Sequence, residues 1–452
     1  MKKPISIIIS VVILLGFILH YGYVYAEKEY DNYIKVRLTY PLKSEREIKL
    51  YSNDGFYLYN IDDMENEIEF FDINEIRIVV EEGEIYILDS DEELVYFLDN
   101  GEDLLIKSRK ENIIKVEEMY YRGYIMFNTS GDKLCIINYL DIEEYLYGVV
   151  PREMGSSFHM EALKAQAIAS RTYAMRNLNK HISDGYNLCD TVHCQVYGGY
   201  NVESPKTSEA VDKTKGMIIT YNGRPIDAAF HSNSGGHTDD AKEIWGGDAP
   251  YLTGRVDEFS KSFPNSSWKL NLTSEEIGSK LKNNGINVGK VLDLIILDTT
   301  PAGRVSEIVI VGTTGKKIIS GNEFRTIIGG DTLKSTLFTV DKENKFDNEI
   351  KIYSIDKYEN KKNVALNNIG IIDKDGNILK ADKINYIITD RGIEHVNLDT
   401  IANIVNFTIY GKGYGHGLGM SQWGAEGMAL NGYNYEEILK YYYKGVDIEY
   451  MR

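Results

Sequence analysis

The chain has 452 residues, of which 43% are hydrophobic and 26% charged, as is ordinary for a folded protein of more than one domain. Its formal net charge of −18 argues against nucleic acid as a partner, because phosphate binding depends on lysine and arginine. The same charge argues against docking on anionic lipid through a polybasic patch, and three cysteines are too few for a disulfide framework.

The N-terminus has the pattern of an exported protein. Lys2 and Lys3 precede an apolar run from Ile5 to Leu19, and the segment ends at Ala26. This pattern predicts a cleaved signal peptide or a retained membrane anchor over residues 1–26. Three tyrosines near its end suit a membrane interface and favour the anchor. In both cases we expect the rest of the chain to be extracytoplasmic.

Residues 33–120 are expected to form a small β-rich module. Ile34, Val36 and Leu38 alternate with other residues, which is the period of a half-buried strand. Asp54–Gly55 and Gly83 each separate two strand-like runs and predict two hairpins.

The stretch YLYGVVPREM, residues 145–154, ends an apolar run with a glutamate, Glu153. We interpret it as an extended segment that leads through a turn into a helix. Charged residues are seldom buried unless they are paired or used. Glu153 is therefore either half of an ion pair or a carboxylic acid held in a site.

A long helix is predicted directly after Glu153. The run from Phe158 to Lys180 contains neither glycine nor proline, and Ser156 or Ser157 is the expected N-cap.

A group of cysteines and histidines follows this helix. Cys189, His193 and Cys194 lie within six positions, and His181 precedes Cys189 by eight. Thiolates and imidazoles of this kind suit tetrahedral zinc, which would hold the loop and not catalyse. The alternatives are a Cys189–Cys194 disulfide or two free thiols.

Residues 228–247 predict an open polar pocket with His231, Ser234 and His237. A Ser–His nucleophile pair is conceivable, but no G-x-S-x-G elbow is present. The S-N-S-G-G segment looks more like an array of backbone donors for sugar or acyl oxygens.

Later segments add structural signals. Thr273–Glu276 has the form of a capping box, and strands are expected at 291–297 and 305–311, on either side of TTPAGR. Residues 341–403 are rich in Lys, Asn, Asp and Ile and are interpreted as an inserted β-rich segment.

A glycine-rich block near the C-terminus, GKGYGHGLGMSQWGA, contains Tyr414, His416 and Trp423. It lacks the G-K-[ST] ending of a phosphate loop. Its alternating glycines allow positive φ or close approach to a ligand. A groove for an extended polymer and a tight-turn loop are both consistent with it.

Together these motifs resemble the stage II sporulation protein D (SpoIID)/LytB-domain family. The motifs EEYLYGVVPREM, EALKAQAIASRTYA, LCDTVHCQVYGG, HSNSGGHT, AGRV and GYGHGLGMSQWGA occur in the family's order over residues 121–340 and 404–450. The resemblance implies an α+β, β-rich catalytic core with one central helix, in residues 121–340 plus 404–452. The 33–120 module would precede this core, and 341–403 would be inserted in it.

The resemblance also implies a function in the cell wall. The sporulation members are lytic transglycosylases that cut glycan strands stripped of stem peptides, together with a partner amidase and an engulfment complex. Other members are amidase enhancers, so a non-catalytic activator is the alternative. A metal-dependent hydrolase is a more distant third.

Site residues follow from the matching motifs. Glu153 would be the catalytic acid, and Lys164 and Arg171, which share one helix face, would support the cleft. The family's Cys/His segment, zinc-bound in some members, corresponds to Cys189 and Cys194, with His181 or His193 as further ligands. The expected substrate contacts from the later motifs are His231, Ser234, His237, Tyr414, His416 and Trp423.

Two departures from the family pattern stand out. Phe230 replaces a tyrosine that many members have before H-S-N-S-G-G, and the 341–403 segment is longer than usual.

Overall fold

The computed structural model describes residues 32–39, 44, 46–98, 103–345 and 404–451, and the backbone of six short strands between 351 and 395. The predicted leader, residues 1–26, lies outside the described residues. The chain divides into two compact units, one running to Ala229 and resuming at Ala425, the other spanning Phe230–Gly424. Within the described part, no helix is both long enough and apolar enough to cross a membrane.

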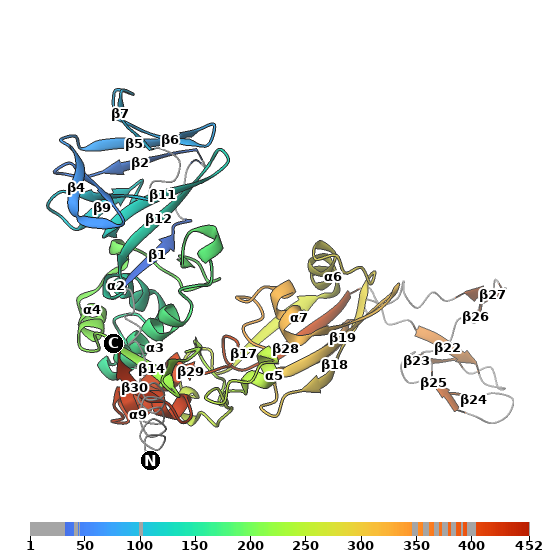
Figure 1. Ribbon diagram of the computed structural model, residues 1–452. Helices are drawn as coiled ribbons and strands as arrows, with labels where there is room; N and C mark the ends of the chain where they lie inside the picture. Colours follow the sequence, from blue (N-terminus) through green and yellow to red (C-terminus); the bar gives the residue numbers. More distant parts are fainter. Residues whose placement is uncertain are drawn as a thin grey trace, which may run out of the picture. The chain divides into compact units, whose positions relative to one another are not determined.

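Two sheets form the N-terminal part of the first unit (Figure 1). The seven-stranded sheet has the order β13-β1-β12-β11-β8-β3-β4, and the six-stranded sheet has the order β10-β9-β2-β5-β6-β7. The strands are β1 (Tyr33–Arg37), β2 (Glu47–Tyr51), β3 (Phe56–Asn60), β4 (Asp63–Phe71), β5 (Glu75–Glu81), β6 (Glu84–Leu88), β7 (Leu94–Leu98), β8 (Leu104–Ser108), β9 (Ile113–Val116), β10 (Met119–Arg122), β11 (Tyr124–Ser130), β12 (Lys133–Asp141) and β13 (Leu188–Cys189). Ile34 and Val36 are fully buried on β1, which confirms the predicted alternation.

One of the two predicted hairpins is confirmed. Strands β5 and β6 pair antiparallel from Glu81 to Glu84, and both residues of the connecting turn, Glu82 and Gly83, have positive φ. This is the backbone of the two-residue turn that matches strand twist.

The other predicted hairpin, at Asp54–Gly55, is wrong. Strand β2 pairs with β5 and β9, whereas β3 pairs with β4 and β8, so the chain passes from one sheet to the other here. The Asp54 carboxylate accepts hydrogen bonds from the hydroxyls of Ser52 and Ser108, each at 2.9 Å, and from the Lys110 N–H at 2.7 Å. These contacts stabilise a crossover, which local turn chemistry cannot distinguish from a hairpin.

The helices of the first unit surround α3 (Met160–Arg176), which contacts α2, α4, α9 and β14. The remaining elements are α2 (Ile142–Glu153), α4 (Pro205–Asp212), α9 (Tyr435–Tyr442) and the sheet of β15 (Arg224–Pro225), β14 (Met217–Tyr221) and β30 (Asp447–Tyr450). The predicted central helix is thus confirmed, but its N-cap is His159 and not Ser156 or Ser157. The His159 ring accepts from the Glu161 N–H at 3.2 Å, because the chain first makes a turn closed by the Phe158 N–H and the Gly155 carbonyl.

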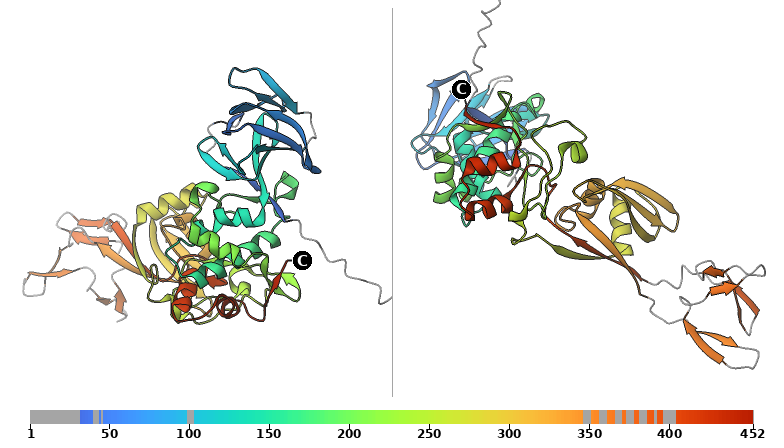
Figure 2. Two further views of the ribbon diagram at one scale, coloured as in Figure 1. Left: turned by 90° about the vertical axis from the view of Figure 1, so that its left-hand side faces the viewer. Right: turned by 90° about the horizontal axis from the view of Figure 1, so that it is seen from below.

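The second unit has a separate hydrophobic core under two three-stranded sheets, with the orders β17-β28-β21 and β18-β19-β20. Helices α6 and α7 pack on these strands (Figure 2). The elements are β17 (Trp268–Thr273), α6 (Ser274–Asn283), β18 (Val291–Thr299), β19 (Val305–Gly312), β20 (Gly315–Ser320), α7 (Gly321–Ile328), β21 (Phe338–Lys345) and β28 (Ile404–Gly411). The capping box at Thr273 and the strand pair on either side of TTPAGR are confirmed.

Within residues 341–403 the six described strands pair as three antiparallel hairpins. They are β22 (Lys351–Ile355), β23 (Lys361–Ala365), β24 (Gly370–Ile372), β25 (Ile378–Lys380), β26 (Tyr386–Thr389) and β27 (Gly392–His395). The expected β-rich α+β class is therefore confirmed. The domain boundaries at 33–120, 121–340 with 404–452, and 341–403 stay predictions, and β11 and β12 share a sheet with strands of the 33–120 module.

Candidate functional site

Glu153 is the last residue of helix α2, so the interpretation of residues 145–154 as an extended segment is wrong. The Asp141 side chain caps the helix by accepting from the Glu143 N–H at 2.8 Å. The buried apolar residues recur at the helical spacing of three and four. They are Ile142, Tyr145, Leu146, Val149 and Val150.

The carboxyl group of Glu153 is half-buried at the carbonyl end of α2, where negative charge is unfavourable. Tyr145, two turns earlier, is fully buried and donates its hydroxyl to the Gln195 side chain at 3.1 Å. Burial chiefly raises the pKa of Tyr145 well above 10, and the charge of Glu153 adds to this shift. Glu153 thus lies near a buried tyrosine that connects α2 to the segment after the cysteines.

Arg171 is buried in an ion pair with Glu143, and its predicted support of a cleft stays a prediction. Its side chain is 0% exposed, and its Nε and Nη2 donate to the two oxygens of Glu143 at 2.8 and 2.6 Å. Its Nη1 donates to the Met217 carbonyl at 3.0 Å, and Glu143 also accepts from the Gly216 N–H. A guanidinium used in this way cannot contact a substrate. It joins α2, α3 and the start of β14.

Lys164 lies on the same helix and is half-buried. It pairs with Glu161 at 2.7 Å, and its ammonium lies 5.5 Å from the centre of the Tyr435 ring. Glu161 in turn accepts from the Tyr435 N–H at 3.0 Å. Lys164 therefore connects α3 to α9, and its predicted contact with substrate stays a prediction.

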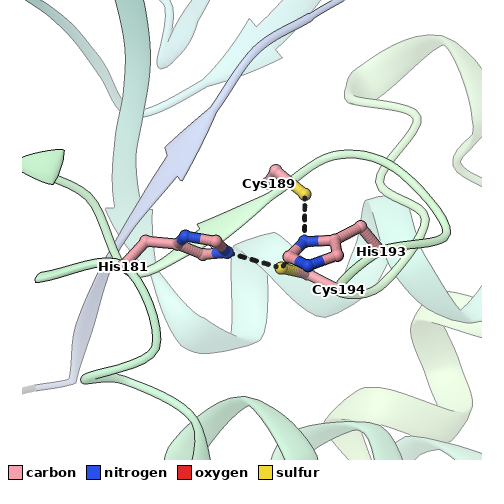
Figure 3. A group of neighbouring side chains, drawn as sticks. All are labelled: His181, Cys189, His193 and Cys194. Atoms are coloured by element: carbon pink, nitrogen blue, oxygen red, sulfur yellow. Dashed lines mark hydrogen bonds between the residues drawn. The ribbon is translucent and has the colours of Figure 1, made fainter.

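The four predicted metal ligands converge (Figure 3). The Sγ of Cys194 lies 3.4 Å from His181 Nε2 and 3.5 Å from His193 Nδ1, and the Sγ of Cys189 lies 3.7 Å from His193 Nδ1. A tetrahedral zinc ion with bonds of about 2.3 Å to sulfur and about 2.0 Å to nitrogen places such atoms about 3.5 Å apart. These three donor pairs therefore have the spacing of a tetrahedral zinc shell, and all four donor atoms lie within 4.8 Å of one another.

Surrounding groups orient these donors. Strand β13 pairs with β1 and positions Cys189, while Asp184 lies 3.4 Å from the other ring nitrogen of His181, in the manner of a carboxylate behind a metal-bound histidine. Burial acts to raise the pKa of Cys189, but hydrogen bonds from Thr191, His193 and Cys194 outweigh it and lower the pKa to about 7. All three cysteines of the chain are free, so the alternative disulfide does not form.

The motifs of the second unit form another cluster around two histidines. Strand β16 (Phe230–His231) pairs with β29 (Met420–Ser421), next to α8 (Gln422–Leu430). The rings of His231 and His416 are 5.5 Å apart, and Trp245, at the end of α5 (Ala241–Trp245), lies 6.0 Å from His416. The glycine block covers the cluster with positive φ at Gly413, Gly415, Gly417 and Gly419.

Both histidines are held neutral. Burial, followed by the positive charge of Arg304, lowers the pKa of His416 to about 4. Burial and the neighbouring His416 and Arg304 lower the pKa of His231 well below 6.5.

Arg304, in the AGRV motif, has a position under the glycine block that sequence spacing did not reveal. It is fully buried, and its guanidinium donates to the Ser234 carbonyl at 2.9 Å. A side chain at Gly417 would lie 2.3 Å from this guanidinium. Burial lowers the pKa of Arg304 to about 10, against the attraction of Asp239.

The predicted array of backbone donors is wrong, and the Ser–His pair that was disfavoured for lack of an elbow does not form. The Ser234 hydroxyl is fully buried and donates to Asp257 at 2.7 Å, not to a histidine. The N–H groups of Asn233, Gly235 and Gly236 are bonded within the protein, to the Tyr414 carbonyl, the Asn233 side chain and the Ser234 hydroxyl. These donors hold the two loops together and are not available to sugar oxygens.

The other predicted contacts of this unit lie partly at the surface. His237 is half-buried, with its Nδ1 2.5 Å from the Thr238 carbonyl. The Tyr414 hydroxyl donates to Asp331 at 2.5 Å, and Trp423 stacks on Phe263 at 5.1 Å. Their roles toward substrate stay predictions. Glu153 and the metal ligands belong to the first unit, whereas these residues belong to the second.

Comparison with known proteins places these residues in a family. Residues 130–221 match the family described as Stage II sporulation protein (SpoIID). Stage II sporulation protein D of Bacillus subtilis is 31% identical over 68% of this chain and 74% of that protein. The chain belongs to the SpoIID family.

Two further relatives agree with this assignment. An uncharacterised protein of Brachyspira hyodysenteriae is 31% identical over 73% of this chain and 72% of its own length. The amidase enhancer of Bacillus subtilis is 31% identical over 67% of this chain, which spans 40% of that protein. The SpoIID-matched segment contains Glu153, Arg171 and all four candidate metal ligands, while residues 264–357 match a separate domain of unknown function (DUF8618).

Replacing Arg171 with methionine should destabilise this SpoIID-family protein strongly. The change leaves the Glu143 carboxylate buried without its partner, which costs about 3–5 kcal/mol. Urea denaturation measures the loss in the free energy of unfolding. Arg176→Met is the control on the same helix, because Arg176 is 52% exposed and its change should cost less than about 0.5 kcal/mol. Equal losses for both variants would contradict the structural role of Arg171.

The depressed pKa of His416 predicts a loss of stability in acid. The unfolded chain binds a proton at about pH 6.5, but the folded chain does so only near pH 4. The contribution is therefore fully present above pH 6.5 and is lost as pH falls toward 4. Chemical denaturation of wild type and His416→Gln across this window should show a shallower fall in the variant. His159→Asn, at an exposed helix cap, is the control, and parallel curves for wild type and His416→Gln would refute the prediction.

Proposed function

We propose that this SpoIID-family chain is a peptidoglycan lytic transglycosylase that cleaves peptide-stripped glycan strands, with Glu153 as its single acid and base. The relatives' names, stage II sporulation protein D and amidase enhancer, support a role in sporulation and the cell wall. The observation that carries the enzymatic part is the place of Glu153, half-buried at the carbonyl end of a helix that the Glu143–Arg171 pair fixes.

The reaction needs one carboxyl group. Protonated Glu153 donates its proton to the glycosidic oxygen as the bond from that oxygen to C1 breaks. The carboxylate then takes the proton of the 6-hydroxyl on the sugar that contains this C1. The 6-oxygen attacks C1 and closes a 1,6-anhydro ring. Glu153 is protonated again at the end. Since no water attacks, the second carboxylate of an ordinary glycosidase is unnecessary.

The site of action in this proposal is outside the cytoplasm. The basic and apolar pattern of residues 1–26 supports export, with the segment cleaved or kept as an anchor. An amidase that removes stem peptides, and proteins of an engulfment complex, are the partners that fit the proposal. The name of the amidase enhancer relative supports the amidase partner.

A zinc ion held by His181, Cys189, His193 and Cys194 is a further part of the proposal. Four protein donors would complete a tetrahedral shell, which is typical of structural and not catalytic zinc. Such an ion would fix the loop between α3 and Gln195. Because Gln195 accepts from the Tyr145 hydroxyl, a rigid loop would also support α2.

The second candidate function is a non-catalytic enhancer of an N-acetylmuramoyl-L-alanine amidase. The similarity to the Bacillus subtilis amidase enhancer favours it. An enhancer would bind the wall with the same fold and would tolerate the loss of Glu153.

Glu153→Gln should abolish cleavage of peptide-free glycan strands, since the amide cannot donate the proton. Mass spectrometry of the products should show 1,6-anhydro ends for wild type and none for the variant. Glu144→Gln is a matched control, because Glu144 is also half-buried and lies on the same helix. Reducing-end products would mean that water attacks. Glycan binding without cleavage by wild type would favour the enhancer.

Metal analysis of the purified chain should find about one zinc per molecule, lost in Cys189→Ser and Cys194→Ser. Removing the ion with a chelator should lower Tm, because ligand binding to the folded state contributes to stability. Cys135→Ser is the control, since Cys135 is outside the four-residue cluster. Retained zinc in both ligand variants, or an unchanged Tm after its removal, would exclude the structural zinc site.

A further inference from the structure

The second unit contains a cavity of about 560 Å³ that no part of the proposed reaction uses. It lies at the end of the three-stranded sheet where β17 and β21 begin and β28 ends. The lining comprises Ser267, Trp268, Lys269, Gly303, Leu337, Phe338, Thr339, Tyr410, Gly411 and Lys412. It overlaps the matched domain of unknown function over residues 264–357.

Aromatic rings give this cavity a firm apolar surface. Trp268 and Phe338 pair with Gly411 on either side of β28, and the Trp268 indole lies across the glycine. A Cβ at Gly411 would come within 2.1 Å of this ring, so only glycine permits the arrangement. The indole N–H donates to the Gly413 carbonyl at 2.8 Å and fixes the ring. Tyr410, beside it on β28, is 44% exposed and offers its ring to a ligand.

The charge of the cavity is opposite to that of the chain. Its described lining contains Lys269 and Lys412, both exposed, and no carboxylate, although the whole chain has 68 acidic and 50 basic residues. The Lys269 ammonium lies 5.4 Å from the centre of the Tyr410 ring, so a cation and an exposed aromatic surface are adjacent. The two lysines give an anion a local attraction here.

We propose that this cavity binds an acidic saccharide, with a sugar ring stacked on Tyr410 and a carboxylate paired with Lys269 or Lys412. An apolar wall with a few convergent polar groups is the usual form of a ligand site. The choice of glycan rests on the proposed function. Removal of the stem peptide leaves a free carboxylate on each muramic acid, so the cavity has the chemistry to recognise peptide-stripped strands. This binding site is separate from Glu153.

Lysine footprinting tests the assignment at residue resolution. The full chain carrying Glu153→Gln, which leaves glycan uncut, is treated with acetic anhydride with and without peptide-free glycan oligosaccharides. Mass spectrometry should show protection of Lys269 and Lys412, but not of Lys316 and Lys317, which are exposed on β20 of the same unit. Equal acetylation of Lys269 and Lys412 with and without glycan would overturn the proposal.

Variants separate the two chemical elements of the site. In the same background, Tyr410→Ala should abolish the protection and weaken glycan binding about tenfold, as loss of a stacking ring does for other planar ligands. Lys412→Glu, or reduction of the glycan carboxylates, should also weaken binding, whereas Lys316→Glu should not. Unchanged binding in Tyr410→Ala and Lys412→Glu would refute the site, and equal protection by poly(glycerol phosphate) would refute its assignment to a saccharide.

Failure of this binding site can be distinguished from failure of the proposed catalytic function. A chain with intact Glu153 and Tyr410→Ala should still produce 1,6-anhydro ends from short oligosaccharides if the catalytic proposal holds. Absence of these products from wild type would refute the catalysis but leave the footprint as an independent result.

Discussion

The buried ion pair between Glu143 and Arg171 is the constraint on which the arrangement of helices in the first unit depends. Two short hydrogen bonds join the first turn of α2 to the middle of α3, and additional bonds to the backbone at Gly216 and Met217 include β14. A buried charge pair of this kind adds little net stability compared with apolar residues. The pair does fix the arrangement of α2, α3 and β14, because any other arrangement would leave a charge buried without a partner. The position of Glu153, at the other end of α2, depends on that arrangement.

In the second unit, hydrogen bonds between neutral backbone groups hold two distant segments of the chain together. Two loops nearly two hundred residues apart, HSNSGG and GYGHGLG, exchange backbone hydrogen bonds between Asn233 and Tyr414. Glycines with positive φ let the second loop lie directly on the Arg304 guanidinium and the His231 side chain. Burial chiefly lowers the pKa of both histidines, and the positive charge of Arg304 adds to this shift. The motif's abundance of polar residues therefore reflects internal packing, which a sequence pattern cannot distinguish from an open pocket.

The sequence predicted what local chemistry decides. Alternation in β1, the turn at Gly83, the capping box at Thr273 and the long helix α3 all follow from residues close together in the chain. The convergence of the four candidate metal ligands was also predictable, because cysteine and histidine at this density are typical of a metal site.

The features that the sequence did not predict depend on contacts between residues far apart in the chain. The crossover at Asp54 depends on Ser108 and Lys110, and the role of Arg171 depends on Glu143 and the start of β14. Helix α2 was not predicted for another reason. Its apolar residues form a nearly continuous run, which suggested an extended segment, although the buried ones also recur at the helical spacing of three and four. The helix includes Pro151 in its last turn and ends at Glu153.

In the proposed function Glu153 is the single acid, and the contacts of helix α2 bear on how that residue is positioned. Helix α2 is fixed near its start by Arg171, and in its middle Tyr145 reaches Gln195, directly after the last of the four metal-ligand candidates. The Tyr145 ring also packs against the Tyr197 ring, with centres 5.1 Å apart and planes tilted by 35°. The Tyr197 hydroxyl donates to Asn138 on β12. The helix is thus supported from α3, from the Cys/His loop and from the sheet. In the proposed chemistry one group must first give and then take a proton, so that group has to stay in place between the two steps, and these supports of α2 would meet that requirement.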